Sequence, residues 1–473
     1  MKQRIQKNKS IINWIALASS TAASSLFSFI IFIIIGRKMS VEGYAQFSVI
    51  TALASTFATF VNNVASGTVL NREIATKPYK TLAYIKKAFS IRVFTFFVGA
   101  VIIFLYSKTK YGYGNGLGLC VVALLSYDVF YEFFEQVAFG YKITKYSSII
   151  NISAMFMLLL IFIVLPSEWC SLQSVLTIYV CVYILKYCVY YFCDLKEFKR
   201  SDYGEKAMVK EIINPSLPYF WMRVVGTLST QLPVLLLEGY SDISEVSYYS
   251  VGNKFTLPLT ILVNTAINAF FPYYTQYFKQ DTDKYKKMLF SMLSMAIQIS
   301  SVFAVVMSVS SPIWLPLIMG NKYISAVYPF QIQVWYTCVL CIDLIISMAF
   351  SSSFKQNVLA VITTIDVIIL LPVLYFTISY GAVGVSLSKI ICSVACLVYH
   401  VIIIFQQLKP TRKQIKAVLT QILSMIILIA ITTLIKDAMM VIASAIIVIV
   451  IGLFIELPVI KELIVERSRG NEL

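Results

Sequence analysis

Residues 147–166 read SSIINISAMFMLLLIFIVLP, twenty residues without one charged side chain. A helix needs about 20 mostly apolar residues to cross the hydrocarbon core of a bilayer. Runs of this kind recur from Ile11 almost to Glu456, and the loops between them are short, polar and usually basic. The sequence therefore predicts a polytopic membrane protein of the all-α class.

We expect fourteen membrane-spanning helices with no separate soluble domain between them. Apolar residues make up 59% of the chain and charged residues 13%, whereas a soluble domain is about 25% charged. The first run is a retained helix rather than a signal peptide, because it is longer than a usual signal h-region. The expected spans are 12–35, 42–65, 83–106, 117–140, 147–166, 172–193, 216–238, 245–272, 287–310, 326–350, 356–379, 383–406, 415–435 and 438–457.

The distribution of basic residues predicts the topology. If the spans alternate, most of the 39 Lys and Arg lie on the side of the amino terminus. The six in the opposite loops are Arg37, Lys38, Lys108, Lys110, Lys322 and Lys436. Basic loops stay in the cytoplasm, so we expect both termini to be cytoplasmic. The net charge of +16 then reflects topology and anionic lipid headgroups rather than a nucleic-acid partner.

Motifs of enzymes and metal sites are missing from the sequence. It contains no P-loop, no H-E-x-x-H and no nucleophile elbow. Its one C-x-x-C, from Cys338 to Cys341, lies in an apolar span, where we expect packing rather than redox or metal chemistry. The single histidine, His400, lies near the cytoplasmic end of its span, and we expect an interfacial residue rather than a proton carrier. Transport without catalysis or a cofactor is the expectation.

An internal repeat divides the chain. VEGYAQFSV at 41–49 matches ISEVSYYSV at 243–251, an offset of 202 residues, and the tight turn FGYKI at 139–143 has an echo in SFKQN at 353–357. Six helices separate the corresponding elements, so the two halves have the same orientation in the membrane. This predicts two parallel six-helix bundles, 1–200 and 201–408, with a substrate path between them. Two additional helices and a tail follow in 409–473.

Five stretches of the chain carry a resemblance to a known family. They are GRKMSVEGYAQF at 36–47, GTVLNRE at 67–73, FFPYY at 270–274, GNKYISA at 320–326 and YGAVGV at 380–385. In order and spacing the sequence resembles the polysaccharide flippases of the multidrug/oligosaccharidyl-lipid/polysaccharide exporter superfamily. The resemblance implies a lipid-linked oligosaccharide translocase that works by alternating access between two bundles around a cationic cavity.

Cations inside the expected spans are the first candidates for a site, because each costs about 2.5–3.5 kcal/mol at the centre of a membrane helix. Arg223 and Lys254 lie deepest, on the helices that open the second half. Arg presents a fork of donors suited to phosphate and Lys offers a point charge, so we expect both to bind a pyrophosphate in a shared cavity. Lys186 and Lys389 are weaker candidates. For all four cations, structural ion pairs or snorkelling are the alternatives.

Carboxylates inside the spans are the candidates for ion coupling. Asp128, Glu132 and Glu135 follow one another at i, i+4 and i+7 and so share one face of a helix. That face either binds H⁺ or Na⁺ or forms salt bridges to Lys186, Arg223 or Lys254. Asp343 and Asp366 are further candidates, and the repeat places Asp343 near the counterpart of the first cluster.

We therefore expect a protein that flips an undecaprenyl-pyrophosphate-linked oligosaccharide across a bacterial cell membrane during surface polysaccharide biosynthesis. Its partners would be this substrate, membrane lipids and a polysaccharide polymerase or glycosyltransferases, without nucleic acid. One alternative is a multidrug or organic-cation exporter of the same architecture, which should have an acidic cavity. The other is a non-transporting membrane partner of a polysaccharide synthase.

Overall fold

The computed structural model describes residues 20, 22–76, 81–111, 114–140, 144–198, 208–353, 356–434 and several positions between 440 and 450. Within these residues every regular element is a helix, which confirms the all-α prediction. Ten helical segments of this part of the chain are long and apolar enough to cross a membrane. The beginning of the first expected span and most of the last, 438–457, lie outside the described residues.

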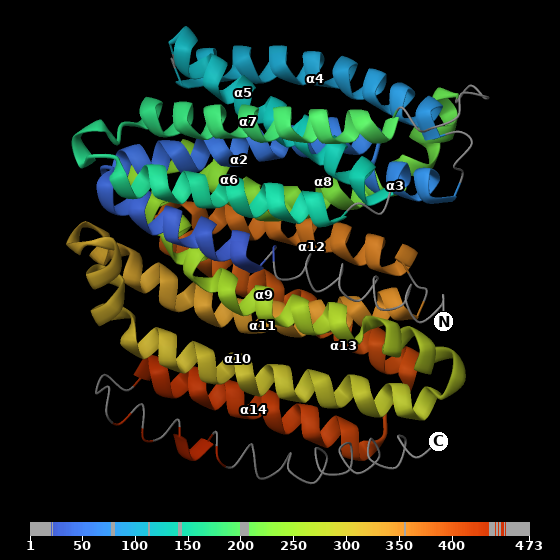
Figure 1. Cartoon of the computed structure of the whole chain (residues 1–473). Helices are drawn as coiled ribbons and strands as arrows, with labels where there is room; N and C mark the ends of the chain where they lie inside the picture. Colours follow the sequence, from blue (N-terminus) through green and yellow to red (C-terminus); the bar gives the residue numbers. More distant parts are fainter. Residues whose placement is uncertain are drawn as a thin grey trace. The chain divides into compact units, whose positions relative to one another are not determined.

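Each expected span from 42–65 to 415–435 coincides with a helix (Figure 1). These helices are α2 (Val41–Val64), α4 (Thr81–Tyr111), α5 (Asn115–Gly140), α6 (Thr144–Val164), α7 (Leu172–Phe198), α8 (Val209–Tyr240), α9 (Ile243–Gln280), α10 (Thr282–Met319), α11 (Val327–Ser352), α12 (Gln356–Thr377), α13 (Gly381–Leu408) and α14 (Arg412–Leu434). The shorter elements are α3 (Gly67–Thr76), η2 (Ser167–Trp169), η3 (Asn321–Ala326) and η4 (Ile378–Tyr380).

The structure differs from the expectation mainly in helix length. α9 and α10 have 38 residues each, longer than the spans expected there. Hydropathy marks only the part of a helix that can lie in lipid, and no Gly or Pro interrupts residues 273–311, so both helices continue into polar sequence. α3 is an additional short helix, separated from α2 by Ala65 and Ser66.

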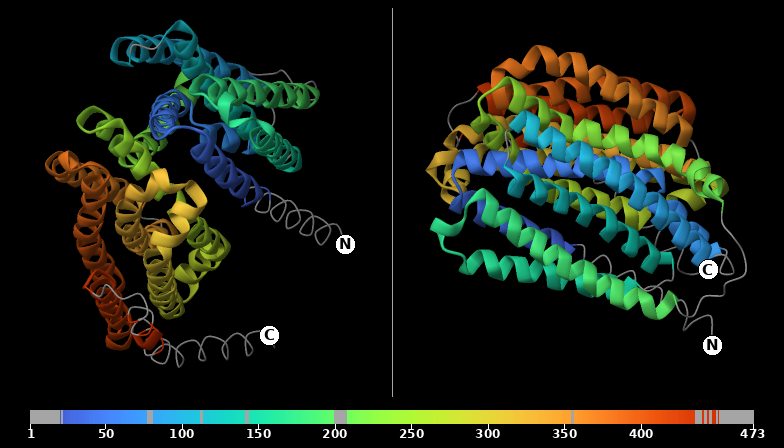
Figure 2. Two further views of the ribbon diagram at one scale, coloured as in Figure 1. Left: turned by 90° about the vertical axis from the view of Figure 1, so that its left-hand side faces the viewer. Right: turned by 90° about the horizontal axis from the view of Figure 1, so that it is seen from above.

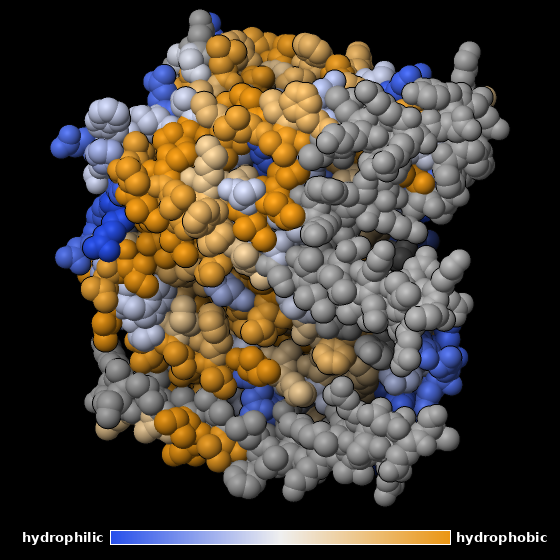
Figure 3. Space-filling model, in the orientation of Figure 1, coloured by the Kyte–Doolittle hydropathy of each residue, from blue (hydrophilic) through white to orange (hydrophobic). Residues whose placement is uncertain are grey.

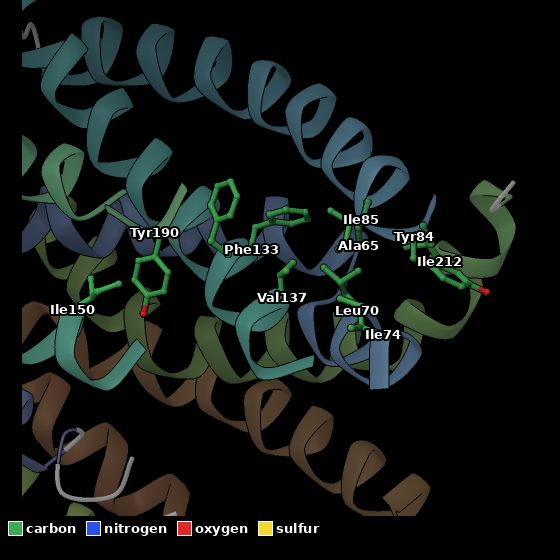
Figure 4. Close-up of a cluster of buried hydrophobic side chains, with 12 residues drawn as sticks. Ala65, Leu70, Ile74, Tyr84, Ile85, Phe133, Val137, Ile150, Tyr190 and Ile212 are labelled. Carbon is green, nitrogen blue, oxygen red and sulfur yellow. The ribbon is translucent and has the colours of Figure 1, made fainter. Parts of the chain in front are cut away.

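By their contacts the residues form two units, 1–238 and 239–473. Each unit is a bundle of aligned helices (Figure 2). In the first unit α5 packs against α2, α3, α4 and α7, and α6 packs against α7. Two apolar clusters form its core, and Figure 4 shows the one where side chains of α3, α4, α5 and α8 meet.

The second unit repeats these contacts. Its central helix α11 packs against α9, α10 and α13, and α12 packs against α13. The corresponding pairs are therefore α2 and α9, α4 and α10, α5 and α11, α6 and α12, and α7 and α13. α2 begins at Val41 and α9 at Ile243, the offset that the sequence repeat has. α14 packs against α10. The bundle boundaries expected at 200 and 408 stay predictions of the repeat.

The outer faces of the helices are apolar. Figure 3 shows apolar side chains gathered over α6 and α7. On α6 the exposed residues include Phe156, Leu160 and Ile163, and on α7 they include Leu185 and Phe192. A soluble protein rarely exposes such a continuous apolar surface, whereas a membrane helix presents one to lipid.

Candidate functional site

Glu135 is the centre of a buried polar cluster in the first unit. Its Oε1 accepts hydrogen bonds from the Tyr131 hydroxyl on α5 at 2.6 Å and from Ser147 Oγ and Asn151 Nδ2 on α6 at 3.1 Å each. The Tyr190 hydroxyl on α7 donates to Ser147 Oγ at 2.7 Å. Three helices are thus joined through one carboxylate, which neutral donors satisfy.

Lys186 on α7 completes this cluster. Its side chain is only 4% exposed, and Nζ lies 3.7 Å from the centroid of the Tyr131 ring. The ammonium interacts electrostatically with Glu135 and Asp128, and Asp128 in turn interacts with Glu132. Lys186 therefore interacts electrostatically with two of the three expected carboxylates. The salt-bridge and ion-binding alternatives for this face both stay predictions.

Arg92 is a buried cation that the sequence interpretation missed. It is fully buried on α4, and its guanidinium donates to the carbonyl oxygens of Val129 at 2.9 Å, Ala65 at 3.2 Å and Asn62 at 3.3 Å. The last carbonyl groups of a helix have no hydrogen-bond partner within it. Arg92 supplies donors to such carbonyl groups at the carboxyl end of α2, where this helix ends before α3 begins. A lone Arg within the apolar run 83–106 was the signal for such a role.

A second cluster joins three helices of the second unit. His400 on α13 lies between two carboxylates: Nδ1 is 2.6 Å from Asp343 Oδ1 on α11, and Nε2 is 3.2 Å from Asp366 Oδ1 on α12. The Tyr399 hydroxyl also donates to Asp366 Oδ1. His400 is 2% exposed. The ring is therefore enclosed between helices. The predicted position of His400 at the membrane interface stays a prediction.

Lys389 lies on the same helix as His400, and it is also buried. Its Nζ is 5.3 Å from the Tyr336 ring centroid on α11 and 5.7 Å from that of Tyr249 on α9. Tyr336 interacts electrostatically with both Lys389 and Asp343. Tyr336 therefore links Lys389 electrostatically to Asp343. Because the ammonium is buried beside two tyrosine rings, it does not snorkel to a surface.

Arg223 and Lys254 have a different environment. Arg223 lies on α8 in the first unit and Lys254 lies on α9 in the second, and both side chains are exposed. An exposed cation within a membrane span must face water or a polar ligand, since lipid would not solvate it. The shared cavity predicted for Arg223 and Lys254 involves one residue from each unit, and it stays a prediction.

No group of three or more His, Cys, Asp and Glu in the described part of the chain is arranged to hold a metal ion. Cys338 and Cys341 are fully buried, and Cys338 Sγ donates to the carbonyl oxygen of Ser300 at 3.0 Å. The expected packing role of this pair agrees with that environment.

Comparison with solved structures identifies the fold. A structure described as the lipid II flippase MurJ in an inward closed conformation superposes with a TM-score of 0.69 at 13% identity, over 95% of this chain and 100% of that chain. An inward-facing MATE family multidrug resistance transporter of the MOP superfamily gives 0.64 at 11% identity, over 82% and 96%. A MOP superfamily transporter from Pyrococcus furiosus, titled for the reverse polarity of its binding pocket, gives 0.55 at 10%, over 84% and 95%.

Sequence comparison identifies the family. No curated protein matches the sequence. Residues 10–278 match the family described as polysaccharide biosynthesis protein, which is more than half of the 473 residues. The repeated helix contacts of the two units and the fold shared with MurJ and MATE transporters agree with this match. The chain is a member of the polysaccharide biosynthesis protein family, with the fold of the MOP superfamily transporters.

Proposed function

We propose that this protein flips a lipid-linked oligosaccharide across the bacterial cell membrane by alternating access, in the biosynthesis of a surface polysaccharide. The observation that carries the proposal is the pair of exposed cations, Arg223 and Lys254, on membrane helices of a polysaccharide biosynthesis family member. An undecaprenyl pyrophosphate is a compact anion at the membrane surface, and guanidinium and ammonium groups bind such phosphates well.

The proposal also covers the membrane topology of the chain and the ion gradient that drives transport. Both termini lie in the cytoplasm, as the basic loops predict, and a polysaccharide polymerase or glycosyltransferases act on the same carrier lipid before or after transport. A gradient of H⁺ or Na⁺ returns the empty carrier. The carboxylates considered for that step are Asp128, Glu132, Glu135, Asp343 and Asp366.

Reconstitution tests the proposal. Purified protein in proteoliposomes that contain an undecaprenyl-pyrophosphate oligosaccharide should make the glycan accessible to a lectin on the opposite leaflet. The double variant Arg223→Ala with Lys254→Ala should lose this activity. Arg412→Ala with Lys416→Ala removes the same charges from exposed positions of α14 and should retain it. Full flipping by the first variant would refute the role of the two cations.

Organic-cation export is the second candidate function, and the likeness to MATE transporters favours it. The same vesicles decide between the two functions. A protein that accumulates a fluorescent organic cation and leaves the oligosaccharide in its original leaflet is an exporter of cations. A protein that moves neither would favour the third candidate, a membrane partner of a polysaccharide synthase.

A further inference from the structure

The side chains of Asp343, His400 and Asp366 form one polar cluster inside the helix bundle of the second unit. His400 contacts one carboxylate through each ring nitrogen, at 2.6 Å and 3.2 Å. An imidazole can donate from both nitrogens only when it is the doubly protonated imidazolium. The arrangement therefore places an ionisable imidazole between two carboxylates, with a hydrogen bond at Nδ1.

The two contacts are not equivalent. The contact of Nδ1 with Asp343 has the length of a charge-assisted hydrogen bond. Nε2 is buried, and its contact with Asp366 is longer and lacks the angle of a good hydrogen bond. If His400 loses a proton and keeps the one on Nδ1, Nε2 presents a lone pair to the Asp366 carboxylate. That contact between α13 and α12 then becomes repulsive, while the hydrogen bond of Tyr399 to Asp366 Oδ1 still joins the two helices.

Charge balance in the surroundings supports this reading. With both carboxylates ionised, the three residues carry one net negative charge when the ring is an imidazolium and two when it is neutral. The imidazole is buried, and the side chains of Asp343 and Asp366 are 29% and 24% exposed. The other titratable or charged side chains that face the cluster, directly or through Tyr336, are Tyr336 on α11, Lys389, Cys392, Cys396 and Tyr399 on α13, and Tyr249 on α9. Lys389 is the cation of this set, and its ammonium lies beside the Tyr336 and Tyr249 rings rather than beside Asp366.

We propose that Asp343, His400 and Asp366 form a proton-binding site that joins α11, α12 and α13 when it is occupied and weakens the α12–α13 contact when it is empty. This assigns the coupling ion and its residues within the second unit. The transport consequence rests on the proposed flippase function, whereas proton binding itself does not. In transport, release of this proton changes the packing of α12 during one half of the cycle.

The chain offers a direct measurement, because it contains one histidine. Full-length protein labelled with ¹³C and ¹⁵N in histidine, in lipid nanodiscs, gives a single imidazole in the NMR spectrum. Wild-type protein should show both N–H groups at pH 7 and lose one as the pH rises. Asp343→Asn and Asp366→Asn should each lower the midpoint of that titration by about 1–3 pH units, the effect of an opposite charge within 4–6 Å.

The control is Asp283→Asn on α10, whose side chain is 96% exposed, and its titration should match the wild type. A ring that stays neutral from pH 5 to 9, or a midpoint that is unchanged in both Asp variants, overturns the proposal. So does loss of one N–H signal when sodium chloride replaces choline chloride at constant pH, since the site would then take Na⁺. The wild-type titration does not depend on the folding of any variant.

Flipping assays separate this inference from the proposed function. Wild-type protein in proteoliposomes should change its flipping rate at least several-fold when a pH gradient is imposed, and His400→Gln should flip at a rate that the gradient does not change. If the wild type flips nothing while its imidazole titrates as expected, the proposed function fails and the proton site stands. If flipping of both proteins responds equally to the gradient, the proton site fails alone.

Discussion

Two polar clusters occupy corresponding helices of the two units and balance their charges in different ways. In the first unit, α5, α6 and α7 surround Glu135 with hydroxyl and amide donors, and Lys186 lies against an aromatic ring. In the second unit, α11, α12 and α13 place His400 between two carboxylates. The cation of the first cluster thus lies beside one ring and faces two carboxylates, whereas the imidazole of the second cluster contacts a carboxylate at each ring nitrogen. Our proposal gives the response to protons to the second cluster.

The largest expected effect concerns Lys186, the cation of the first cluster. Lys186→Met removes the buried charge that faces the half-buried Asp128 and Glu135. Removing one partner of a buried charge pair costs about 3–5 kcal/mol of the free energy of unfolding. Lys389→Met removes a cation that packs on two tyrosine rings, and should cost about 0.5–2 kcal/mol. Thermal unfolding in detergent compares the two variants. Equal losses of stability would contradict the distinction between the clusters.

The next prediction compares the response to protons. Glu135→Gln keeps an oxygen that can accept the hydrogen bonds of Tyr131, Ser147 and Asn151, so it should lower stability by about 1 kcal/mol and leave the pH dependence of flipping intact. His400→Gln should remove that dependence. The assay is the flipping rate in proteoliposomes at several external pH values. Loss of the pH response in Glu135→Gln would instead place the coupling site in the first unit.

A third comparison concerns helix ends of the two units, at Gly381 in the second unit and at Lys38 in the first. α13 begins at Gly381, whose φ of +65° is unfavourable for residues with a side chain. A Cβ there would lie 2.4 Å from Glu245 Oε2, which accepts a hydrogen bond from the Ala382 amide at 2.8 Å. Gly381→Ala should therefore cost about 1–3 kcal/mol, measured by thermal unfolding. Gly114→Ala in the first unit meets open space and should leave stability unchanged.

The smallest effect is expected at the corresponding end of the first unit. Lys38 Nζ donates to the carbonyl oxygens of Phe162, Ile163 and Leu165 at 2.8, 3.1 and 2.6 Å. A cation at a helix carboxyl end interacts favourably with the helix dipole, so Lys38→Met should cost about 0.3–1 kcal/mol. Lys38→Arg, as the control, should restore the melting temperature. A melting temperature of Lys38→Met equal to that of the wild type would show that these contacts contribute nothing.

The sequence by itself determined that the chain crosses a membrane many times, where most of its helices lie and which family it resembles. These properties follow from hydropathy, loop charge and short motifs, and all of them are local along the chain. The repeat also placed Asp343 near the counterpart of the acidic helix face. Helix ends were less predictable, because polar residues continue α9 and α10 beyond the apolar runs.

Only the tertiary structure decided which polar side chains meet. Asp343 and Asp366 lie 57 and 34 residues before His400, and no periodicity within one helix shows which faces of α11, α12 and α13 pack together. The same limit applied to Arg92, whose partners are carbonyl groups of Asn62 on α2, Ala65 directly after α2 and Val129 on α5. A buried charge must find partners wherever packing places them. Its position in the sequence therefore predicts that partners exist, and the packed bundle decides what they are.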